Sequence, residues 1–219
     1  MSYKNNKNIG TATVTVTGKG NYTGTAKKNF RIIAKKGSVF TVGFNKYKII
    51  SNGTVAFSGL KTSKTKKVTI PKTVKIGGKN FKITSIAANA LKSKKITQVT
   101  IGSNVGTIGK NAFYKCTKLT KITLGSAMTS IGDNAFYSCS SLKNLTLPSK
   151  VTTIGKGAFT NCKKLGTITI KSTKLKKVGK NAFKGIKTTA KIKVPANKLS
   201  AYKKLLKGKG QGKKVTIVK

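Results

Sequence analysis

Histidine and acidic side chains are almost missing from this 219-residue sequence, which has no histidine, no glutamate and one aspartate, Asp133. General acid–base catalysis needs a group that titrates near neutral pH, most often a histidine or a carboxylate. A tetrahedral metal site needs a cluster of thiolate, imidazole or carboxylate ligands. The composition therefore predicts that the protein is not an enzyme and that it holds no metal and no cofactor.

A serine–lysine pair is the catalytic arrangement that this composition leaves open. Ser58 and Lys61 have the required spacing, but chance matches to Ser-x-x-Lys are expected in a lysine-rich chain. Gly18, Gly20 and Gly24 differ by one residue from a dinucleotide fingerprint, but they lie between two expected strands, where a hairpin turn explains them. We expect neither motif to carry chemistry.

The sequence also lacks a long hydrophobic run and an N-terminal signal peptide. No stretch approaches the ~20 apolar residues that a membrane-spanning helix requires, so we expect no transmembrane segment. The first residues resemble the interior of a module, so the missing signal says little about where the protein is located.

Lysine dominates what is present: 47 basic residues, of which only Arg31 is an arginine, give a formal net charge of +46. Such a charge first suggests disorder, but 37% of the residues are hydrophobic and these follow a pattern. We therefore expect a folded body with a lysine coat. Flexible, hydrated ammonium groups suit loose attraction to a polyanion; the alternative is a coat that only keeps the protein soluble.

One hexapeptide pattern recurs four times, with isoleucine or valine first, glycine second, and alanine and phenylalanine last. The copies are residues 108–113, 131–136, 154–159 and 178–183. Their phenylalanines are 23, 23 and 24 residues apart, and a fixed period of this length indicates a solenoid of small stacked units. Because these phenylalanines should lie in the core, we do not expect the exposed aromatic groups that specific nucleic-acid binding needs.

Each repeat also contributes an apolar-Thr-apolar triplet, such as residues 122–124. Neighbouring side chains of a strand point to opposite faces, so the threonines should form an outward column. Hydroxyl groups beside lysines would suit a carbohydrate or an acidic polymer; the alternative is that threonine favours exposed strand positions. The candidate binding face consists of Thr69, Thr100, Thr123, Thr146, Thr169, Lys67, Lys121 and Lys193.

Lysine is distributed unevenly along the repeats. Residues 132–154 contain two lysines, residues 155–178 contain seven, and the last 49 residues contain 17. Attraction to a polyanion should therefore be strongest toward the C-terminal end. The candidate polyanion-binding residues are Lys174, Lys176, Lys177, Lys203, Lys204, Lys207, Lys213 and Lys214.

The three cysteines, Cys116, Cys139 and Cys162, occupy one repeat position, 23 residues apart. Thiols stacked on successive turns of a solenoid do not form a tetrahedral metal site, and no histidine is present to complete one. Neighbouring cysteines could reach disulfide distance. We expect buried thiols that pack in the core.

The repeat, Ile-Gly-x-x-Ala-Phe followed by cysteine, leucine and an Ile-x-Leu triplet, resembles the BspA-like leucine-rich repeats of bacterial surface proteins. The resemblance covers about residues 65–195. It implies a β-rich (α+β) solenoid, a right-handed coil with parallel strands, short helical turns and terminal caps. It also implies an extracellular or bacterial cell-surface location, and a host or bacterial surface protein or glycan as the partner.

We expect four segments along the chain. Residues 1–33 resemble the closing β hairpin of bacterial immunoglobulin-like repeats, on the stretches 5–10 and 20–24. Residues 34–67 should form a linker and an N-terminal β cap, residues 68–195 the leucine-rich repeats of about 23 residues, and residues 196–219 a C-terminal helix-strand cap.

The sequence thus predicts a non-catalytic cell-surface or secreted binding module that acts in adhesion. A second hypothesis is a lysine-coated electrostatic anchor to anionic cell-wall polymer or another polyanion. A third is an accessory region of a larger secreted enzyme.

Overall fold

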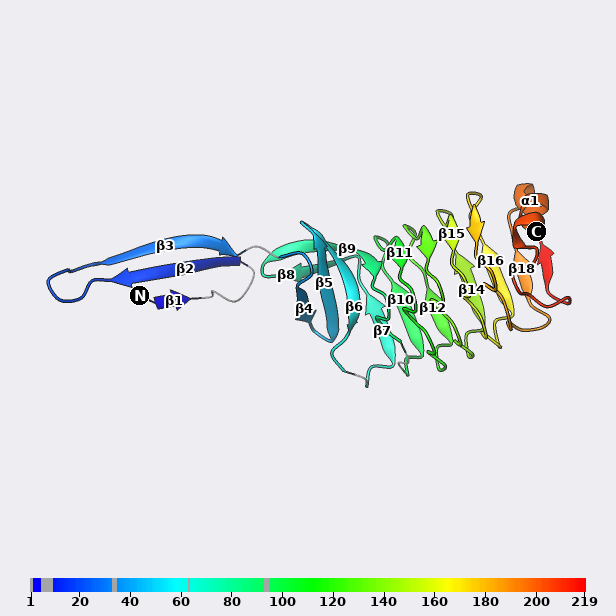
Figure 1. The fold of residues 1–219 in the computed structure, drawn as a ribbon, viewed down its shortest axis with the longest axis horizontal. Coiled ribbons are helices and arrows are strands. Elements are labelled where there is room, and N and C mark those ends of the chain that lie inside the picture. Colours follow the sequence, from blue (N-terminus) through cyan, green and yellow to red (C-terminus); the bar gives the residue numbers. More distant parts are fainter. Residues whose placement is uncertain (1, 5–9, 33–34, 63, 93–94) are drawn as a thin grey trace.

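The structure, a computed structural model, describes residues 2–4, 10–32, 35–62, 64–92 and 95–219. Its main body is a parallel β-solenoid of about seven turns with one short helix. The turns, here called rungs, lie side by side between an N-terminal cap and a C-terminal helix (Figure 1). The predicted solenoid is therefore confirmed. Residues 5–9, which carry part of the resemblance to immunoglobulin-like repeats, lie outside the described residues.

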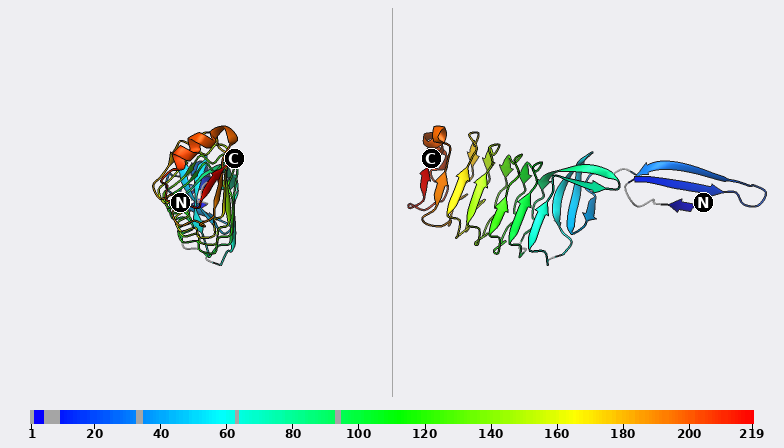
Figure 2. Two further views of the ribbon diagram at one scale, coloured as in Figure 1. Left: turned by 90° about the vertical axis from the view of Figure 1, so that its right-hand side faces the viewer. Right: turned by 180° about the vertical axis from the view of Figure 1, so that it is seen from behind.

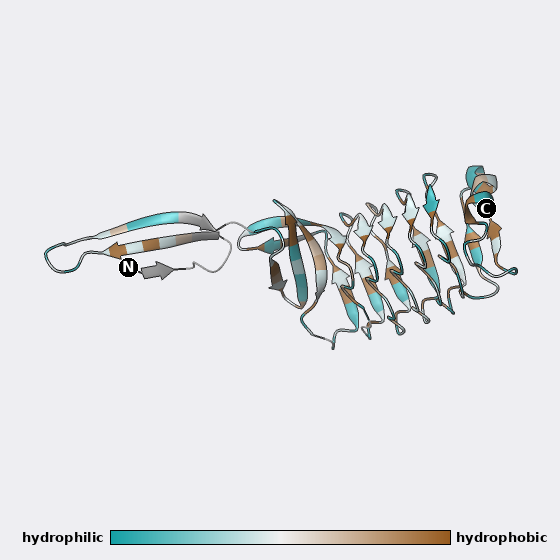
Figure 3. Cartoon of the chain, viewed as in Figure 1, coloured by the Kyte–Doolittle hydropathy of each residue, from teal (hydrophilic) through white to brown (hydrophobic). Residues whose placement is uncertain are grey.

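Two sets of parallel strands form the solenoid, and Figure 2 shows their rungs end-on and from behind. The front sheet contains β7 (Lys67–Ile70), β10 (Gln98–Ile101), β12 (Lys121–Thr123), β14 (Asn144–Leu147), β16 (Thr167–Ile170), β18 (Lys191–Lys193) and β19 (Thr216–Val218). The back sheet contains β9 (Lys79–Ile86), β11 (Thr107–Ile108), β13 (Ser130–Ile131), β15 (Thr153–Ile154) and β17 (Lys177–Val178). In most front strands, buried apolar residues alternate with exposed polar residues. Figure 3 shows this alternation as brown and teal bands along the strands.

A column of stacked phenylalanine rings runs through the core. The ring centroids of Phe113 and Phe136 are 4.9 Å apart, and the column continues through Phe159 and Phe183 at 5.4 and 5.8 Å. All four rings are fully buried, as is the alanine that precedes each of them. Stacked aromatic pairs attract one another beyond the effect of the area they bury, so the column links each rung to the next.

The glycine of the repeat is required because the rungs stack closely. A Cβ atom at Gly155 would lie 2.5 Å from the backbone nitrogen of Asp133 in the preceding rung, and backbone cannot move aside as a flexible side chain can. The first repeat has Ala87 at this position. Ala87 follows the N-terminal cap instead of another repeat, and its backbone nitrogen donates to the oxygen of Phe57 at 2.9 Å.

The asparagine of the repeat has a left-handed backbone conformation. The φ angle is 57° at Asn111, 52° at Asn134 and 59° at Asn181, and Gly157 takes the same place with 61°. Asparagine and glycine adopt this conformation more readily than other residues. A second left-handed position follows four residues later, at Lys115, Ser138, Asn161 and Gly185. The asparagine thus shapes the turn that brings alanine and phenylalanine inward.

The N-terminal cap continues the back sheet. Its strands β4 (Val39–Val42), β5 (Asn45–Ser51) and β6 (Thr54–Leu60) pair antiparallel, and β6 then pairs in parallel with β9. Strand β8 (Thr73–Ile76) forms an antiparallel hairpin with β9 that turns at Gly77 and Gly78, and this hairpin is not among the predicted elements.

The C-terminal cap contains a short 3-10 helix, Ala196–Lys198, and α1 (Leu199–Leu206). Tyr202 and Leu206 are buried, and Leu199 and Leu205 pack against the core, as the helical spacing of these residues predicts. The cap ends with β19, which pairs in parallel with β18 and so covers the last rung of the front sheet.

The N-terminal strands β1 (Ser2–Lys4), β2 (Gly10–Thr17) and β3 (Thr25–Ile32) form a separate antiparallel sheet. The segment between β2 and β3 contains the glycines at 18, 20 and 24, so these residues form a hairpin turn, as the sequence analysis predicts.

Candidate functional site

The outward side chains of the front sheet form a regular polar surface, here called the threonine face. Thr100 lies in register between Thr69 and Thr123, and Thr169 lies between Thr146 and Lys193. The first four threonines of this column are exposed and the fifth is half-buried. The outward column that the sequence analysis predicts is therefore present.

The hydrogen-bond ladder of the front sheet is interrupted between β12 and β14. Strands β7, β10 and β12 form one bonded group, and β14, β16, β18 and β19 form another. At intact boundaries, Thr120 N donates to Thr97 O and Gly166 N donates to Lys143 O, each at 2.9 Å. Within the described part of the chain, Lys143 N makes no equivalent bond to Thr120 O. The back sheet is continuous here, so the rungs separate only at the front.

Pro148 stands at one end of this interruption. The same position in the two preceding rungs is occupied by Gly102 and Gly125, where a Cβ atom would clash with the backbone of the rung before. Proline places a ring in this narrow space and has no N–H group to donate. Lys171, one rung later, donates to the preceding rung at 2.9 Å. Nothing in the sequence explains the missing bond at Lys143.

A cleft of about 580 Å³ opens at the interruption, and we call it the central cleft. The residues that line it are of three kinds, namely apolar, polar and basic. The apolar ones are Ile122, Leu124, Leu145 and Pro148; the polar ones include Thr123, Asn144 and Thr146; the basic ones are Lys121, Lys143 and Lys171.

A second depression of about 460 Å³, here called the basic pocket, adjoins the central cleft. The two share Lys143 and Asn144 as lining residues. The basic pocket adds the lysines at positions 163, 164 and 187. Cationic groups therefore extend from the cleft across the next rungs.

Three of the predicted face residues, Lys121, Thr123 and Thr146, lie together in the central cleft. The others lie outside it on the front sheet: Thr69, Thr100, Thr169, Lys67 and Lys193. Lys143 and Lys171 line the cleft but are not among the residues predicted from the sequence. Pro148 is the residue in the sequence that could have indicated the cleft, because it places a ring where the two preceding rungs have glycine.

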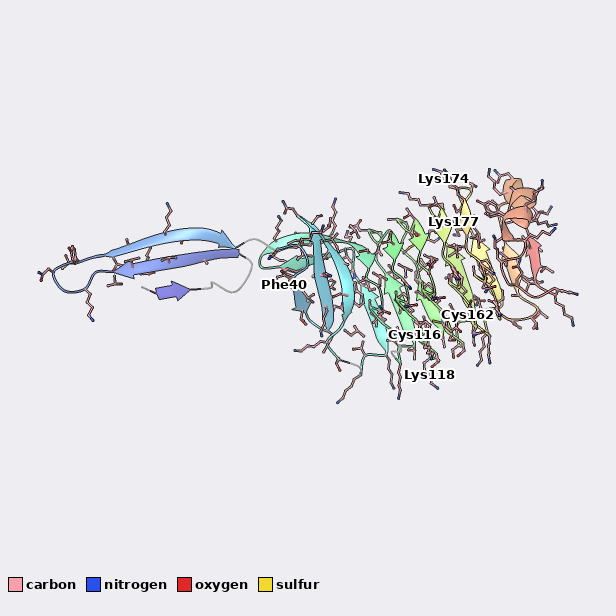
Figure 4. All side chains as sticks on the ribbon, in the orientation of Figure 1. Phe40, Cys116, Lys118, Cys162, Lys174 and Lys177 are labelled. Atoms are coloured by element: carbon pink, nitrogen blue, oxygen red, sulfur yellow. The ribbon has the colours of Figure 1, made fainter. Side chains whose placement is uncertain are left out.

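The predicted polyanion-binding lysines are all exposed and lie on a different part of the solenoid. Tyr202 of α1 fixes the loop before β17, because its hydroxyl accepts from Leu175 N and donates to Ser172 O, both at 2.9 Å. This contact brings the loop with Lys174 to the same end as the lysines of α1; Figure 4 labels Lys174 and Lys177. The binding role of these lysines stays a prediction.

The cysteines are buried, as predicted, and their thiols bond to backbone. Cys139 Sγ donates to Phe113 O at 3.2 Å, and Cys162 Sγ donates to Phe136 O at 3.1 Å. Burial raises the pKa of the Cys162 thiol from 9.0 to about 12, and it raises the pKa of Cys139 well above 9.0. The thiols of Cys139 and Cys162 therefore stay protonated in the folded protein at neutral pH.

We expect the raised pKa of Cys162 to make its contribution to stability depend on pH. The folded state holds the thiol proton more tightly than the unfolded state, so the contribution is complete below about pH 9 and is lost as pH rises toward about 12. Urea unfolding of the protein and of Cys162→Ala should therefore show a stability difference that shrinks as pH rises from about 9 to about 11. A difference that stays constant over this range would contradict the assignment. All residues other than Cys162 are common to the two proteins, so effects of pH that they share cancel in the difference.

The described architecture, parallel strands on stacked rungs with a phenylalanine core, defines a leucine-rich-repeat solenoid. Residues 84–209 match six copies of the BspA type leucine rich repeat region, so the chain belongs to this family. No curated protein matches the sequence. The matching family and structures indicate no catalytic class. No helix among the described residues is long and apolar enough to cross a membrane.

Solved structures of bacterial leucine-rich-repeat proteins resemble the chain. One from Bacteroides capillosus is 27% identical, with a TM-score of 0.54 over 61% of this chain and 98% of its own. One from Bacteroides ovatus is also 27% identical, with a TM-score of 0.61 over 72% of this chain and 48% of its own. A leucine rich cell surface protein from Faecalibacterium prausnitzii shares the fold at 22% identity, with a TM-score of 0.51 over 73% of this chain and 55% of its own.

Proposed function

We propose that the chain is a non-catalytic binding module of a bacterial cell-surface or secreted protein, and that it acts in adhesion through the threonine face. The observation that carries this proposal is the outward column of threonines, which is in register along the front sheet and leads into a cleft lined by polar groups. Family membership supports it, as does the fold shared with a protein described as a cell surface protein. The partner would be a host or bacterial surface protein or glycan.

The N-terminal hairpin fits this arrangement as part of an immunoglobulin-like module that spaces the solenoid from the rest of a surface protein. A lone hairpin is marginally stable in water. Val16 and Tyr22 of the hairpin are exposed, at 43% and 81%, which leaves apolar surface for adjoining chain to cover.

The lysine coat favours electrostatic anchoring to an anionic polymer as a second candidate function. The sequence has a single side-chain carboxylate for 47 basic side chains, so nearly all of them lack an acidic side chain as a partner. Asp133 Oδ1 accepts from the backbone nitrogen of Lys156 at 2.7 Å. The ammonium groups at the C-terminal end are therefore free to attract an anionic polymer.

Two variants and two salt concentrations separate these functions. Binding of the folded protein to immobilised galactan, polygalacturonate, heparin and polyglutamate would be measured at ~50 and ~200 mM salt. Adhesion through the threonine face predicts that Thr123→Asp with Thr146→Asp lowers binding at least ~10-fold, and that binding persists at the higher salt. Anchoring predicts that binding falls steeply as the salt concentration rises. It also predicts that the double variant Lys203→Gln with Lys204→Gln weakens binding more than the double threonine variant does. A threonine variant that binds like the parent protein, beside a weakened lysine variant, would exclude the threonine face.

A further inference from the structure

We infer that the central cleft is a subsite for an anionic sugar unit of a polysaccharide, with the adjoining basic pocket receiving the next unit. This inference rests on the proposed function, because it assumes that the front sheet is the binding surface. It is carried by the interruption between β12 and β14, which is the only place among the described front strands β7 to β18 where the ladder opens.

The lining of the cleft matches the surface of a sugar ring. A pyranose has apolar C–H groups on its faces and hydroxyl groups around its rim. Pro148 and Leu124 are half-buried and line the cleft, so they offer it an apolar platform, whereas Ile122 and Leu145 point into the core. Ligand pockets commonly combine such a platform with a few placed polar groups, and the cleft volume lies within their usual range.

The hydrogen-bonding groups stand beside this platform. Thr123 and Thr146 belong to the same outward column on the two strands that flank the interruption, and Asn144 precedes Thr146 on its strand. Hydroxyl and amide groups can both donate and accept, as sugar hydroxyls do. Hydroxyl and amide groups beside an apolar platform suit a polyhydroxylated ligand better than an aliphatic one.

The charge around the cleft selects an anionic sugar. Lys121, Lys143 and Lys171 come from three successive rungs and line the same cleft. The single acidic side chain, Asp133, lies elsewhere, beside the back sheet, where its carboxylate bonds to backbone. A sugar carboxylate or sulfate would therefore meet a lining that contains three lysines and, among the described residues, no acidic side chain.

The arrangement of the two depressions favours a polymer over a single small anion. Lys143 and Asn144 line both the central cleft and the basic pocket, so one chain can pass from the first into the second. An extended peptide usually binds by adding a strand to a free sheet edge. Strands β12 and β14 remain in contact across the interruption, so no strand fits between them, and we favour the saccharide.

The test measures binding of soluble oligomers to the folded 219-residue chain at ~150 mM salt, where loose attraction is screened. The probes are a galacturonate oligomer, a sulfated dextran oligomer, a neutral galactan oligomer and a glutamate oligomer. We expect at least one anionic sugar to bind ~10-fold or more tightly than neutral galactan and the glutamate oligomer. Binding of the sulfated probe alone would assign sulfate as the recognised group, and binding of galacturonate would assign carboxylate.

Two matched pairs of variants locate the site. Thr146→Phe fills the cleft and should weaken binding of the anionic sugar ~10-fold or more, whereas Thr100→Phe, in the same column outside the cleft, should change it less than ~2-fold. Lys143→Gln should weaken binding more than Lys118→Gln, which removes the same charge outside both depressions. Thermal unfolding checks that each variant is folded.

Equal effects of Thr146→Phe and Thr100→Phe would overturn the cleft assignment, as would tighter binding of the glutamate oligomer or no binding of either anionic sugar. If these results appear while Thr123→Asp with Thr146→Asp still abolishes binding to an immobilised partner, the threonine face stands and only its sugar subsite is wrong. If both sets of variants bind like the parent protein, the proposed function fails as well.

Discussion

Replacing Phe136 with alanine is expected to lower the free energy of unfolding by ~3–5 kcal/mol, the cost of removing a buried phenylalanine and leaving a cavity. Phe136 is fully buried and stacks on Phe113 at 4.9 Å and on Phe159 at 5.4 Å. Because each rung is stabilised mainly by its neighbours, the loss should also loosen the adjacent rungs. Urea unfolding followed by circular dichroism measures the change.

Phe113→Ala provides the matched control. Phe113 is equally buried, but among the described rings it stacks on one phenylalanine only. The Phe136 variant should therefore be less stable than the Phe113 variant by about 0.5–1.5 kcal/mol, the value of one aromatic pair. A nearly neutral Phe136→Ala would show that the column is not the core of the solenoid.

Gly155→Ala is expected to destabilise the protein by ~3 kcal/mol, at the upper end of the usual cost of overpacking. The added methyl group would lie 2.5 Å from Asp133 N and 2.6 Å from the carbonyl carbon of Gly132, so the two rungs must move apart. Parting the rungs would also lengthen the hydrogen bond of 2.8 Å from Gly155 N to Ile131 O. Thermal and urea unfolding measure the effect.

Gly166→Ala is the matched control, because it shows whether any glycine-to-alanine change destabilises the solenoid or only one that clashes with the neighbouring rung. The nearest atom to a Cβ at Gly166 is Cδ of Lys187 at 3.3 Å, the far part of a flexible side chain. We expect a change within ~0.5 kcal/mol, as for ordinary surface substitutions. Equal destabilisation by the two alanines would show that rung spacing does not require the glycine of the repeat.

The repeat period predicts most of the fold because the core residues recur at fixed spacing. The inward positions of Phe136 and Cys139, and the outward position of Thr123, follow from period and strand alternation alone. The left-handed turn at Asn134 is harder to predict, because asparagine adopts several turn conformations. The β8–β9 hairpin breaks the period, so the repeat gives no information about it.

The central cleft could not be predicted from the period, because the spacing of the repeats does not change there. Pro148 stands in the middle of the array, whereas the two other prolines, Pro71 and Pro195, stand in its first and last rungs. Gly125, at the same repeat position one rung earlier, packs closely on the backbone of the rung before it. How little room a proline ring has at position 148 follows from this three-dimensional stacking and not from the sequence. Lys143 was equally hard to predict as a site residue, because lysines occur throughout the sequence.

The divided front sheet and the continuous back sheet also give the solenoid an uneven stiffness. Consider a force that bends the solenoid so that its front sheet is stretched. Hydrogen bonds between neighbouring strands resist this force from β7 to β12 and from β14 to β19, but none do so between β12 and β14. Bending would therefore concentrate at this boundary, and the paired strands β13 and β15 of the back sheet would serve as the hinge. We expect such bending to widen the central cleft, because the cleft lies at the unpaired boundary.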